Sequence, residues 1–353
     1  MYSYQKLFTF TKNIFESIGC PKEDADLATE VLLSADLRGI DSHGVARLIG
    51  YVRLWESNRI NATPSIKTVH ETPSTAVIDG DSGLGLVVAP KAMDLAIQKA
   101  QVAGTGWVAV KNSNHFGIAG YHAMKALPHD MIGIAMTNAS PLVAPTNSLE
   151  RLLGTNPIAV AIPAQEQPAF VADFATTTAA NGKLEILQRK NQEAPTGWIQ
   201  DAQGNMSTNP NELKAGGALV PLGGDTGSHK GYCLGATVDI FSAVLSGANY
   251  GPWVPPFVSF LPVAPNLVGE GIGHFFGAIR IDAFRPASEF KTHMDNWITT
   301  FRNSKSKSSD QPVLIPGDPE RLTSAKRLQE GIPLLDPVIK DLQSLAQRFS
   351  LSF

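Results

Sequence analysis

Features that mark secreted, membrane-spanning and zinc-binding proteins are scarce in this chain. Its 353 residues include only two cysteines, Cys20 and Cys233, which are far apart and belong to no CxxC pair. That spacing argues against a disulfide framework and a cysteine zinc site, and it suits a reducing cytoplasm. No segment approaches the run of about 20 apolar residues that crosses a bilayer, and residues 1–14 lack the apolar core of a signal peptide. We therefore expect a soluble, unprocessed, cytoplasmic protein without a membrane partner.

An excess of charge of either sign is also missing. The net charge is -3, with 17% charged and 43% hydrophobic residues, which is typical of a globular protein without a bias toward polyanions. We expect no nucleic-acid partner. The chain is long for a single core, so its length favours two domains or one large domain with a helical annex.

The glycine fingerprint of a Rossmann fold is absent as well. Gly80, Gly83 and Gly85 follow a short strand signal, but no further glycine stands at the required offset. No acidic residue ends a second strand about 20 residues further on. The glycines within 269–273 fail because the residues around them lack the order of strand, loop and helix. These glycines predict turns and no dinucleotide-binding loop of the Rossmann type.

The hydrophobic periodicity switches between helical and strand patterns along the chain. Apolar spacings of three and four predict two helices within residues 4–37 and a helical unit that ends near residue 60. Short apolar runs predict strands at 66–69, 75–78, 106–111, 132–137, 157–162, 169–174 and 275–281. Helical patterns recur at 88–103, 178–189, 233–245, 287–302 and 322–351, the last of which is interrupted by prolines. The chain is therefore of the α/β class.

The segment from Asp36 to Tyr51 carries the strongest signal for chemistry. A helix that begins near Ser42, a good N-cap, places His43, Arg47 and Tyr51 one turn apart along one side. An imidazole moves protons near neutral pH, a guanidinium grips a carboxylate, and a phenol holds a further oxygen. This ridge fits a small substrate with a carboxylate beside a carbonyl or an alcohol. The alternative is a solvated helix face with an ordinary surface arginine.

Polar residues at three other junctions are candidates for binding anions or sugars. His115 follows the strand at 106–111, where a glycine-spaced helix begins, although a histidine there can also simply bond to backbone. Asp173 ends the strand at 169–174 and can hold a ribose or orient a histidine, or it can cap the next helix. Lys230 follows a glycine loop, which suits either a pyrophosphate seat or a solvated lysine.

Eight short motifs, taken together, resemble one enzyme family. They are Asp-Ser-His-Gly-Val-Ala-Arg (41–47), Asn-Ser-Asn-His-Phe-Gly (112–117), Thr-Asn-Ala-Ser-Pro (137–141), Gly-Thr-Asn-Pro (154–157), Asp-Phe-Ala-Thr (173–176), His-Lys-Gly (229–231), Gly-His-Phe-Phe (273–276) and Ile-Pro-Gly-Asp-Pro (315–319). They span nearly the whole chain in order, and the combination resembles the second, non-Rossmann type of malate/L-lactate dehydrogenase. That family includes malate, lactate, sulfolactate and ureidoglycolate dehydrogenases, a diketogulonate reductase and cyclic imine reductases.

The resemblance implies a nicotinamide-dependent oxidoreductase, usually a homodimer, that uses NAD or NADP. Its cofactor is expected on a mixed or largely antiparallel sheet flanked by helices, outside any Rossmann unit. We assign residues 66–285 to this cofactor-binding α/β domain. Residues 1–65 and 286–353 then form a helical domain.

The resemblance also implies roles for individual residues. His43 and His115 match the histidines that give or take the proton, Arg47 matches the residue for the substrate carboxylate, and Tyr51 stands beside it. The matches to positions that line the cofactor are Ser140, Asp173, Phe174, Ala175, Lys230, Gly317 and Asp318. Related sequences often have Glu at the last position, and a shorter carboxylate there could alter the cofactor contact. No metal is implied.

The function that we expect is interconversion of a small 2-hydroxy acid and its 2-oxo acid, with malate or L-lactate as substrate. His43 is favoured over His115 as the base because it lies one turn from Arg47. Within the same redox class, the substrate can instead be ureidoglycolate, a dioxo sugar acid or a cyclic imino acid. A hydrolase or metal enzyme built on His43, His115 and Asp173 is the alternative from another class, but the sequence lacks a GxSxG elbow and an HExxH motif.

Overall fold

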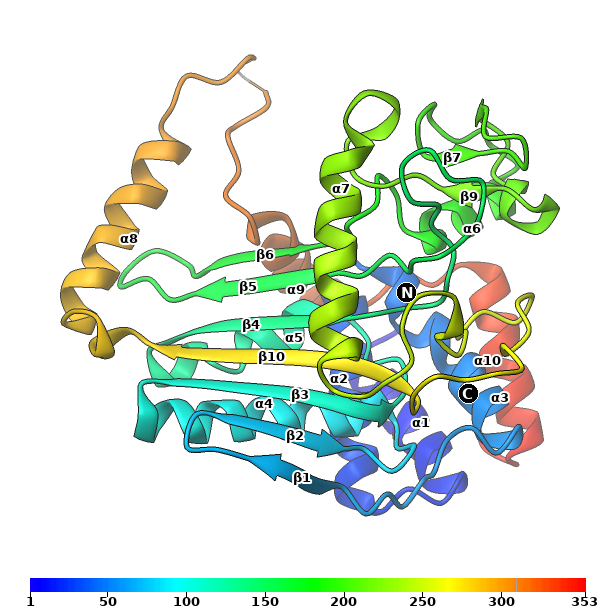
Figure 1. Cartoon of the computed structure of the whole chain (residues 1–353), viewed down its shortest axis with the longest axis horizontal. Coiled ribbons are helices and arrows are strands. Elements are labelled where there is room, and N and C mark those ends of the chain that lie inside the picture. The colour runs from blue at the N-terminus through cyan, green and yellow to red at the C-terminus, as the bar shows by residue number, and fades with distance from the viewer. Residues whose placement is uncertain (309) are drawn as a thin grey trace.

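A seven-stranded sheet forms the centre of the computed structural model, which describes residues 1–308 and 310–353 (Figure 1). Across the sheet the strands follow the order β1 (Lys67–Glu71), β2 (Thr75–Asp79), β3 (Thr105–Ser113), β10 (Ile272–Arg280), β4 (Met131–Thr137), β5 (Ile158–Ile162) and β6 (Phe170–Phe174). Only β2 and β3 pair in parallel, and every other neighbouring pair of this sheet is antiparallel. The predicted non-Rossmann, largely antiparallel sheet is confirmed.

Helices cover both faces of the sheet because small residues on the strands allow a close approach. On one face lie α4 (Gly85–Ala103) and α5 (Ala119–Met124). A Cβ on Gly106 of β3 would stand 1.9 Å from the carbonyl oxygen of Ala96 on α4, so only glycine fits there. On the other face lies α7 (Gly224–Asp239), which continues into a π-helical turn at Ile240–Val244 (Figure 1).

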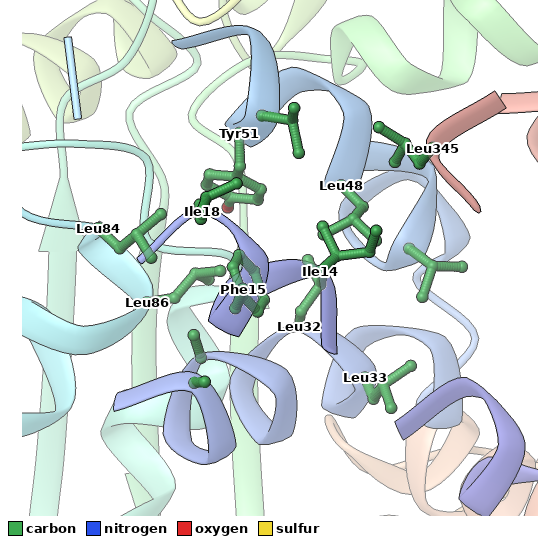
Figure 2. Packing of buried hydrophobic residues seen from close by; sticks show 14 of the residues in the cluster. Ile14, Phe15, Ile18, Leu32, Leu33, Leu48, Tyr51, Leu84, Leu86 and Leu345 are labelled. Atoms are coloured by element: carbon green, nitrogen blue, oxygen red, sulfur yellow. The ribbon is translucent and has the colours of Figure 1, made fainter. Parts of the chain in front are cut away.

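The N-terminal and C-terminal helices share one hydrophobic core. It is built from α1 (Tyr4–Ser17), α2 (Lys22–Leu37), α3 (Leu48–Glu56) and α10 (Asp336–Arg348). Figure 2 shows how side chains from these helices meet those of α4; the labelled ones are Ile14, Phe15, Ile18, Leu32, Leu33, Leu48, Tyr51, Leu84, Leu86 and Leu345. Burying one such side chain stabilises the fold by about 1.5–3 kcal/mol. This core therefore fixes the segment between α2 and α3 from both sides.

The remaining elements surround the sheet. A smaller sheet of β7 (Ile199–Gln200), β8 (Met206–Ser207) and β9 (Ala218–Leu219) follows α6 (Asn181–Lys190). At the β6 edge of the main sheet, Asp295 of α8 (Ala287–Arg302) accepts hydrogen bonds from the backbone of residues 165–167. The last helix before α10 is α9 (Asp318–Glu330). The division into two domains stays a prediction.

Helix α7 corrects one expectation about a loop. Residues 224–232 were expected to form a glycine loop before a helix at 233, but they are already helical. Gly231 serves packing, since a Cβ there would stand 2.2 Å from the backbone nitrogen of Leu222. The low helix propensity of glycine is thus outweighed by close contact with the preceding segment. Within the described residues, no helix combines the length and apolar character that a membrane span requires.

Candidate active site

The connection between α2 and α3 corrects the expected helix at Ser42. Residues Asp41–His43 and Val45–Arg47 form two separate 3-10 turns, and α3 begins only at Leu48. The break is at Gly44, where the carboxylate of Asp36 accepts a hydrogen bond of 2.8 Å from the backbone N–H of Val45. A Cβ on Gly44 would stand 2.1 Å from that carboxylate, so no other residue fits without a shift.

The broken helix nevertheless brings the predicted residues together. His43, His115 and Arg47 line one cavity of about 70 Å³, to which Ser140 and Phe257 also contribute. A second cavity of about 50 Å³ shares both histidines with it. The two imidazole rings stack at 5.7 Å between centroids. An imidazole pair and a guanidinium therefore line the same cavity.

Both imidazoles are neutral at pH 7. Burial, followed by the positive charge of Arg47, lowers the pKa of His43 to about 4. Burial also lowers the pKa of His115 well below its ordinary value, and the positive charge of Arg47 adds to this effect. A neutral imidazole ring can accept a proton at pH 7, as a general base must.

The neighbours of each ring decide where its proton lies. Nδ1 of His115 is 3.4 Å from the backbone N–H of Gly117, which can only donate, so Nδ1 is the acceptor and Nε2 carries the proton. Nδ1 of His43 is 2.9 Å from the hydroxyl of Ser42, which is able to accept. With its proton on Nδ1, His43 is left with a free lone pair on Nε2. The geometry thus allows His43 to act as a base and His115 to donate a hydrogen bond.

Tyr51 lies behind His115 and does not line either cavity. Its side chain is fully buried, and its phenol oxygen is 2.6 Å from Nδ1 of His115. Burial raises the pKa of Tyr51, so the phenol stays protonated. Its O–H can donate to the same Nδ1 that accepts from Gly117. Tyr51 therefore orients His115, whereas the sequence placed it on a common ridge with Arg47.

Arg47 is held by two contacts. Its Nε donates a hydrogen bond of 2.6 Å to the carbonyl oxygen of Ser42. Its Nη2 forms an ion pair of 3.0 Å with Oε2 of Glu185, a residue of α6 that sequence reasoning missed. Nothing in the periodicity of α6 separates Glu185 from an ordinary solvated glutamate, so only the tertiary structure reveals it.

A separate, larger cavity collects three of the residues expected to line a cofactor. Asp173, Phe174 and Gly317 line a space of about 390 Å³, together with Arg38 and Glu320, which were not predicted. Burial raises the pKa of Asp173 to about 6, although a hydrogen bond of 2.7 Å from the N–H of Gly120 lowers it. Residues Arg38 and Ile40 line this cavity while His43 lines the first, so one short segment connects the two.

Comparison with known proteins decides the family. Residues 2–343 match malate/L-lactate dehydrogenase. Malate dehydrogenase from Pyrococcus abyssi is 45% identical over 346 residues, which cover 97% of this chain and 93% of that protein. The chain belongs to the malate/L-lactate dehydrogenase family. L-sulfolactate dehydrogenase from Methanocaldococcus jannaschii is 37% identical over 340 residues, covering 96% of this chain and 94% of that one.

A solved structure of the family supports the fold. The crystal structure of malate dehydrogenase from Entamoeba histolytica has a TM-score of 0.92 at 33% identity and covers 99% of this chain and 98% of that chain. The resemblance inferred from eight motifs is therefore confirmed. Membership in the malate/L-lactate dehydrogenase family implies a nicotinamide cofactor.

The larger cavity fits part of such a cofactor. Phe174 is 40% exposed beside the carboxylate of Asp173, which pairs an apolar surface with an acceptor for hydroxyl groups. Gly317 has a φ of +99°, and a Cβ there would approach Cβ of Val171 to 3.1 Å. These residues can hold a nucleoside of the dinucleotide, while Ser140 lines the cavity with the histidines.

Three of the cofactor positions suggested by the family lie elsewhere. Lys230 is exposed on α7, away from the cavities just described, and Ala175 is half-buried after β6 without lining them. The carboxylate of Asp318 accepts hydrogen bonds from Arg302, Arg321 and the backbone N–H of Ile315. Its neighbours Gly317 and Glu320 line the cavity instead.

Metal ligands do not cluster in this structure. Across residues 1–308 and 310–353, no group of three or more His, Cys, Asp or Glu side chains could hold a metal ion. The three candidate junction residues lie apart: His115 lines the cavity with His43, Asp173 lines the larger cavity, and Lys230 is exposed on the surface of α7.

Proposed function

We propose that this enzyme of the malate/L-lactate dehydrogenase family interconverts L-malate and oxaloacetate with NAD or NADP. One observation carries the proposal: His43, His115 and Arg47 line the same cavity. A 2-hydroxy acid has its hydroxyl one carbon from its carboxylate, so a proton acceptor and a carboxylate ligand must lie side by side. The similarity to malate dehydrogenase of Pyrococcus abyssi supports malate as the first substrate to test.

The residues of the cavity divide the work. Arg47 binds the substrate carboxylate, and Nε2 of His43 accepts the proton of the hydroxyl group. Nε2–H of His115, oriented by Tyr51, donates a hydrogen bond to the same substrate oxygen. A bound nicotinamide would supply the acceptor for the hydride that leaves C2 of the substrate. In the reverse direction His43 returns the proton to the 2-oxo group.

The low pKa of His43 is compatible with its role as the base. Arg47 contributes to that low pKa in the free enzyme, second to burial. The neutral ring is the form that accepts a proton, so His43 is already in the state of a base at pH 7 before the substrate binds.

A substrate panel tests this function. L-Malate, L-lactate, L-sulfolactate, ureidoglycolate, a dioxo sugar acid and a cyclic imino acid are each followed at the nicotinamide absorbance band, with NAD and with NADP. We expect the highest kcat/KM with L-malate and no loss of activity after treatment with a chelator. No turnover of any 2-hydroxy acid would contradict the proposal, whereas activity that a chelator abolishes would favour a metal enzyme.

L-Sulfolactate is the second candidate substrate. The similarity to L-sulfolactate dehydrogenase of Methanocaldococcus jannaschii favours it, and a sulfonate is an anion like the distal carboxylate of malate. Arg47 would bind the shared carboxylate in both compounds. A higher kcat/KM with L-sulfolactate than with L-malate would reverse their order.

We further propose that NAD is preferred to NADP. Asp173 faces the larger cavity with Glu320, against one cation, Arg38. An acidic side chain accepts a hydrogen bond from a ribose hydroxyl but repels a 2′-phosphate. The ratio of kcat/KM for the two dinucleotides, measured with the wild type and with Asp173→Asn, tests this. A ratio unchanged by the substitution would place the discriminating residue elsewhere.

We also propose a homodimer in the cytoplasm. Ile240, Phe241, Val244 and Leu245 at the end of α7 are each more than two-fifths exposed, an apolar group that a second copy of the chain would cover. Light scattering of the purified protein should give twice the chain mass of 37.7 kDa, and Phe241→Glu should lower it. Both cysteines are free, which suits a reducing compartment such as the cytoplasm. Cell fractionation tests this location.

A further inference from the structure

Arg47 lies between two cavities: it lines the one with both histidines and, together with Glu185, a neighbouring one of about 220 Å³. Oε2 of Glu185 is 3.0 Å from Nη2 of Arg47, and both side chains are mostly shielded from solvent, at 17% and 30% exposure respectively. The guanidinium also donates from Nε to the carbonyl oxygen of Ser42. Two of its nitrogens are therefore engaged before any substrate arrives.

The ion pair follows from the position of α6, whose backbone lies close to Arg47. A Cβ on Gly182 would stand 2.5 Å from Cβ of Ser42 and 3.1 Å from Nη2 of Arg47, so the first turn of α6 lies directly against the arginine segment. The other oxygen of Glu185, Oε1, accepts a hydrogen bond of 2.8 Å from Asn181, one turn earlier on the same helix. Asn181 and Gly182 also line the cavity with the two histidines.

Glu185 and a substrate carboxylate are chemically equivalent ligands for the guanidinium. Because the N–H of Nε is committed to Ser42, a carboxylate that binds with two parallel hydrogen bonds needs one N–H each from Nη1 and Nη2, and Glu185 already occupies one of the two N–H groups of Nη2. Two carboxylates on one guanidinium also repel each other. In the absence of substrate, however, Glu185 compensates a cation that stands beside two neutral imidazoles.

We propose that Glu185 is an internal counter-ion of Arg47 that the substrate carboxylate replaces, so that Glu185 determines how tightly this enzyme binds carboxylates. The inference rests on the proposed function of Arg47 as the carboxylate ligand. Exchange of one anion for another keeps the net charge around the Arg47 guanidinium constant while the substrate enters and leaves. The exchange also weakens substrate binding, because the free energy of the Arg47–Glu185 ion pair is lost when the substrate binds. Glu185 is thus a specificity-determining residue for the reaction.

Substitution of Glu185 by Gln tests the exchange. We expect Glu185→Gln to lower the dissociation constant of oxalate, a carboxylate that is not turned over, and the KM of L-malate by about 2–5-fold, the range that a partly exposed ion pair is worth. Because the pair is absent from the substrate complex, kcat should stay within about twofold. Calorimetry on the enzyme saturated with NADH gives the dissociation constant without turnover.

Glu193→Gln is the matched control, since it removes an exposed carboxylate just beyond α6 and changes the net charge equally. It should leave the oxalate affinity unchanged. Glu185→Asp keeps the charge but shortens the reach to Arg47, and it should also tighten oxalate binding. It carries the test if Glu185→Gln fails to fold, as judged by its thermal unfolding.

The outcomes separate this inference from the function beneath it. If Arg47→Ala leaves the oxalate affinity unchanged, the proposed function fails. If Arg47→Ala weakens binding while Glu185→Gln leaves it unchanged or weakens it as well, Glu185 merely positions Arg47 and the counter-ion proposal is overturned. Tighter binding of oxalate in Glu185→Gln and in Glu185→Asp, with Glu193→Gln unaffected, supports it.

Discussion

Two pairs of histidines in this enzyme share low proton affinity but occupy different surroundings. Burial lowers the pKa of His122 and of His274 to about 3, and it lowers that of His43 to about 4. His274 is held by Ser113 on Nε2 and Thr137 on Nδ1, both at 2.7 Å. His43 and His115 instead line a cavity. A perturbed pKa thus identifies a buried histidine, and only a ring nitrogen that faces a cavity indicates chemistry.

The largest expected effect falls on the first pair. Replacing His43 with Gln removes the proposed base while keeping a polar side chain, so kcat should fall about 100- to 10,000-fold. Steady-state turnover at saturating cofactor measures it. His70→Gln on the exposed strand β1 is the control and should behave as wild type. Near-normal turnover of His43→Gln would transfer the role of base to His115.

Substitution in the second pair, His122 and His274, should lower the free energy of unfolding and leave turnover nearly unchanged. His274→Ala removes a buried ring and leaves the hydroxyl of Ser113 without its partner, so we expect a loss of about 2–4 kcal/mol in the free energy of unfolding. Denaturant titration gives the loss. Turnover per folded molecule, counted by titration with a tight inhibitor, should stay within about threefold. A drop in that quantity comparable to that of His43→Gln would erase the distinction between the pairs.

Acid should lower the contribution of both histidine pairs to the free energy of unfolding, because the rings become protonated in the unfolded chain. Each ring is neutral in the fold and has an ordinary pKa of 6.5 when unfolded, so below that pH the unfolded chain binds more protons. The stability that these neutral rings contribute is therefore complete above pH 6.5 and declines toward pH 4. Free energies of unfolding, measured stepwise over that range, should fall less steeply for His274→Ala than for the wild type. Equal slopes would show that His274 does not contribute.

The smallest expected effect concerns the residue behind His115. Tyr51→Phe removes one hydrogen bond to Nδ1, and a neutral hydrogen bond is worth about 1 kcal/mol, so kcat should fall about 5-fold. Because the phenol O–H disfavours protonation of Nδ1, its loss should move the acid limb of kcat/KM to higher pH. Tyr121→Phe removes a phenol that contacts Glu30 and serves as the control. An unshifted pH profile would reduce Tyr51 to a packing role.

Much of this site was accessible from sequence because its chemistry lies at ends of predictable elements. His115 follows a buried strand, and Asp173 ends another, so strand periodicity alone located both. The helix at Ser42 was predicted wrongly because its break depends on the hydrogen bond between Val45 and Asp36, nine residues earlier in the sequence and in contact only in the fold. Glu185 was missed for the same reason, since its partner is 138 residues distant.

The glycines show the same limit from the other side. Those before Cys233 were interpreted as a loop, which is their commonest role, but residues 224–232 are helical and Gly231 packs closely against Leu222. Periodicity predicts how a segment can fold by itself. Contacts between distant segments decide whether it does.

The central place of β10 has a consequence for biosynthesis. It pairs with β3 on one side and with β4 on the other, yet it is the last strand of the sheet to leave the ribosome. Until then a nascent chain presents two bare strand edges, which are templates for pairing with other chains. A chain truncated before residue 272 should therefore aggregate, and a full-length chain closes both edges in a single step.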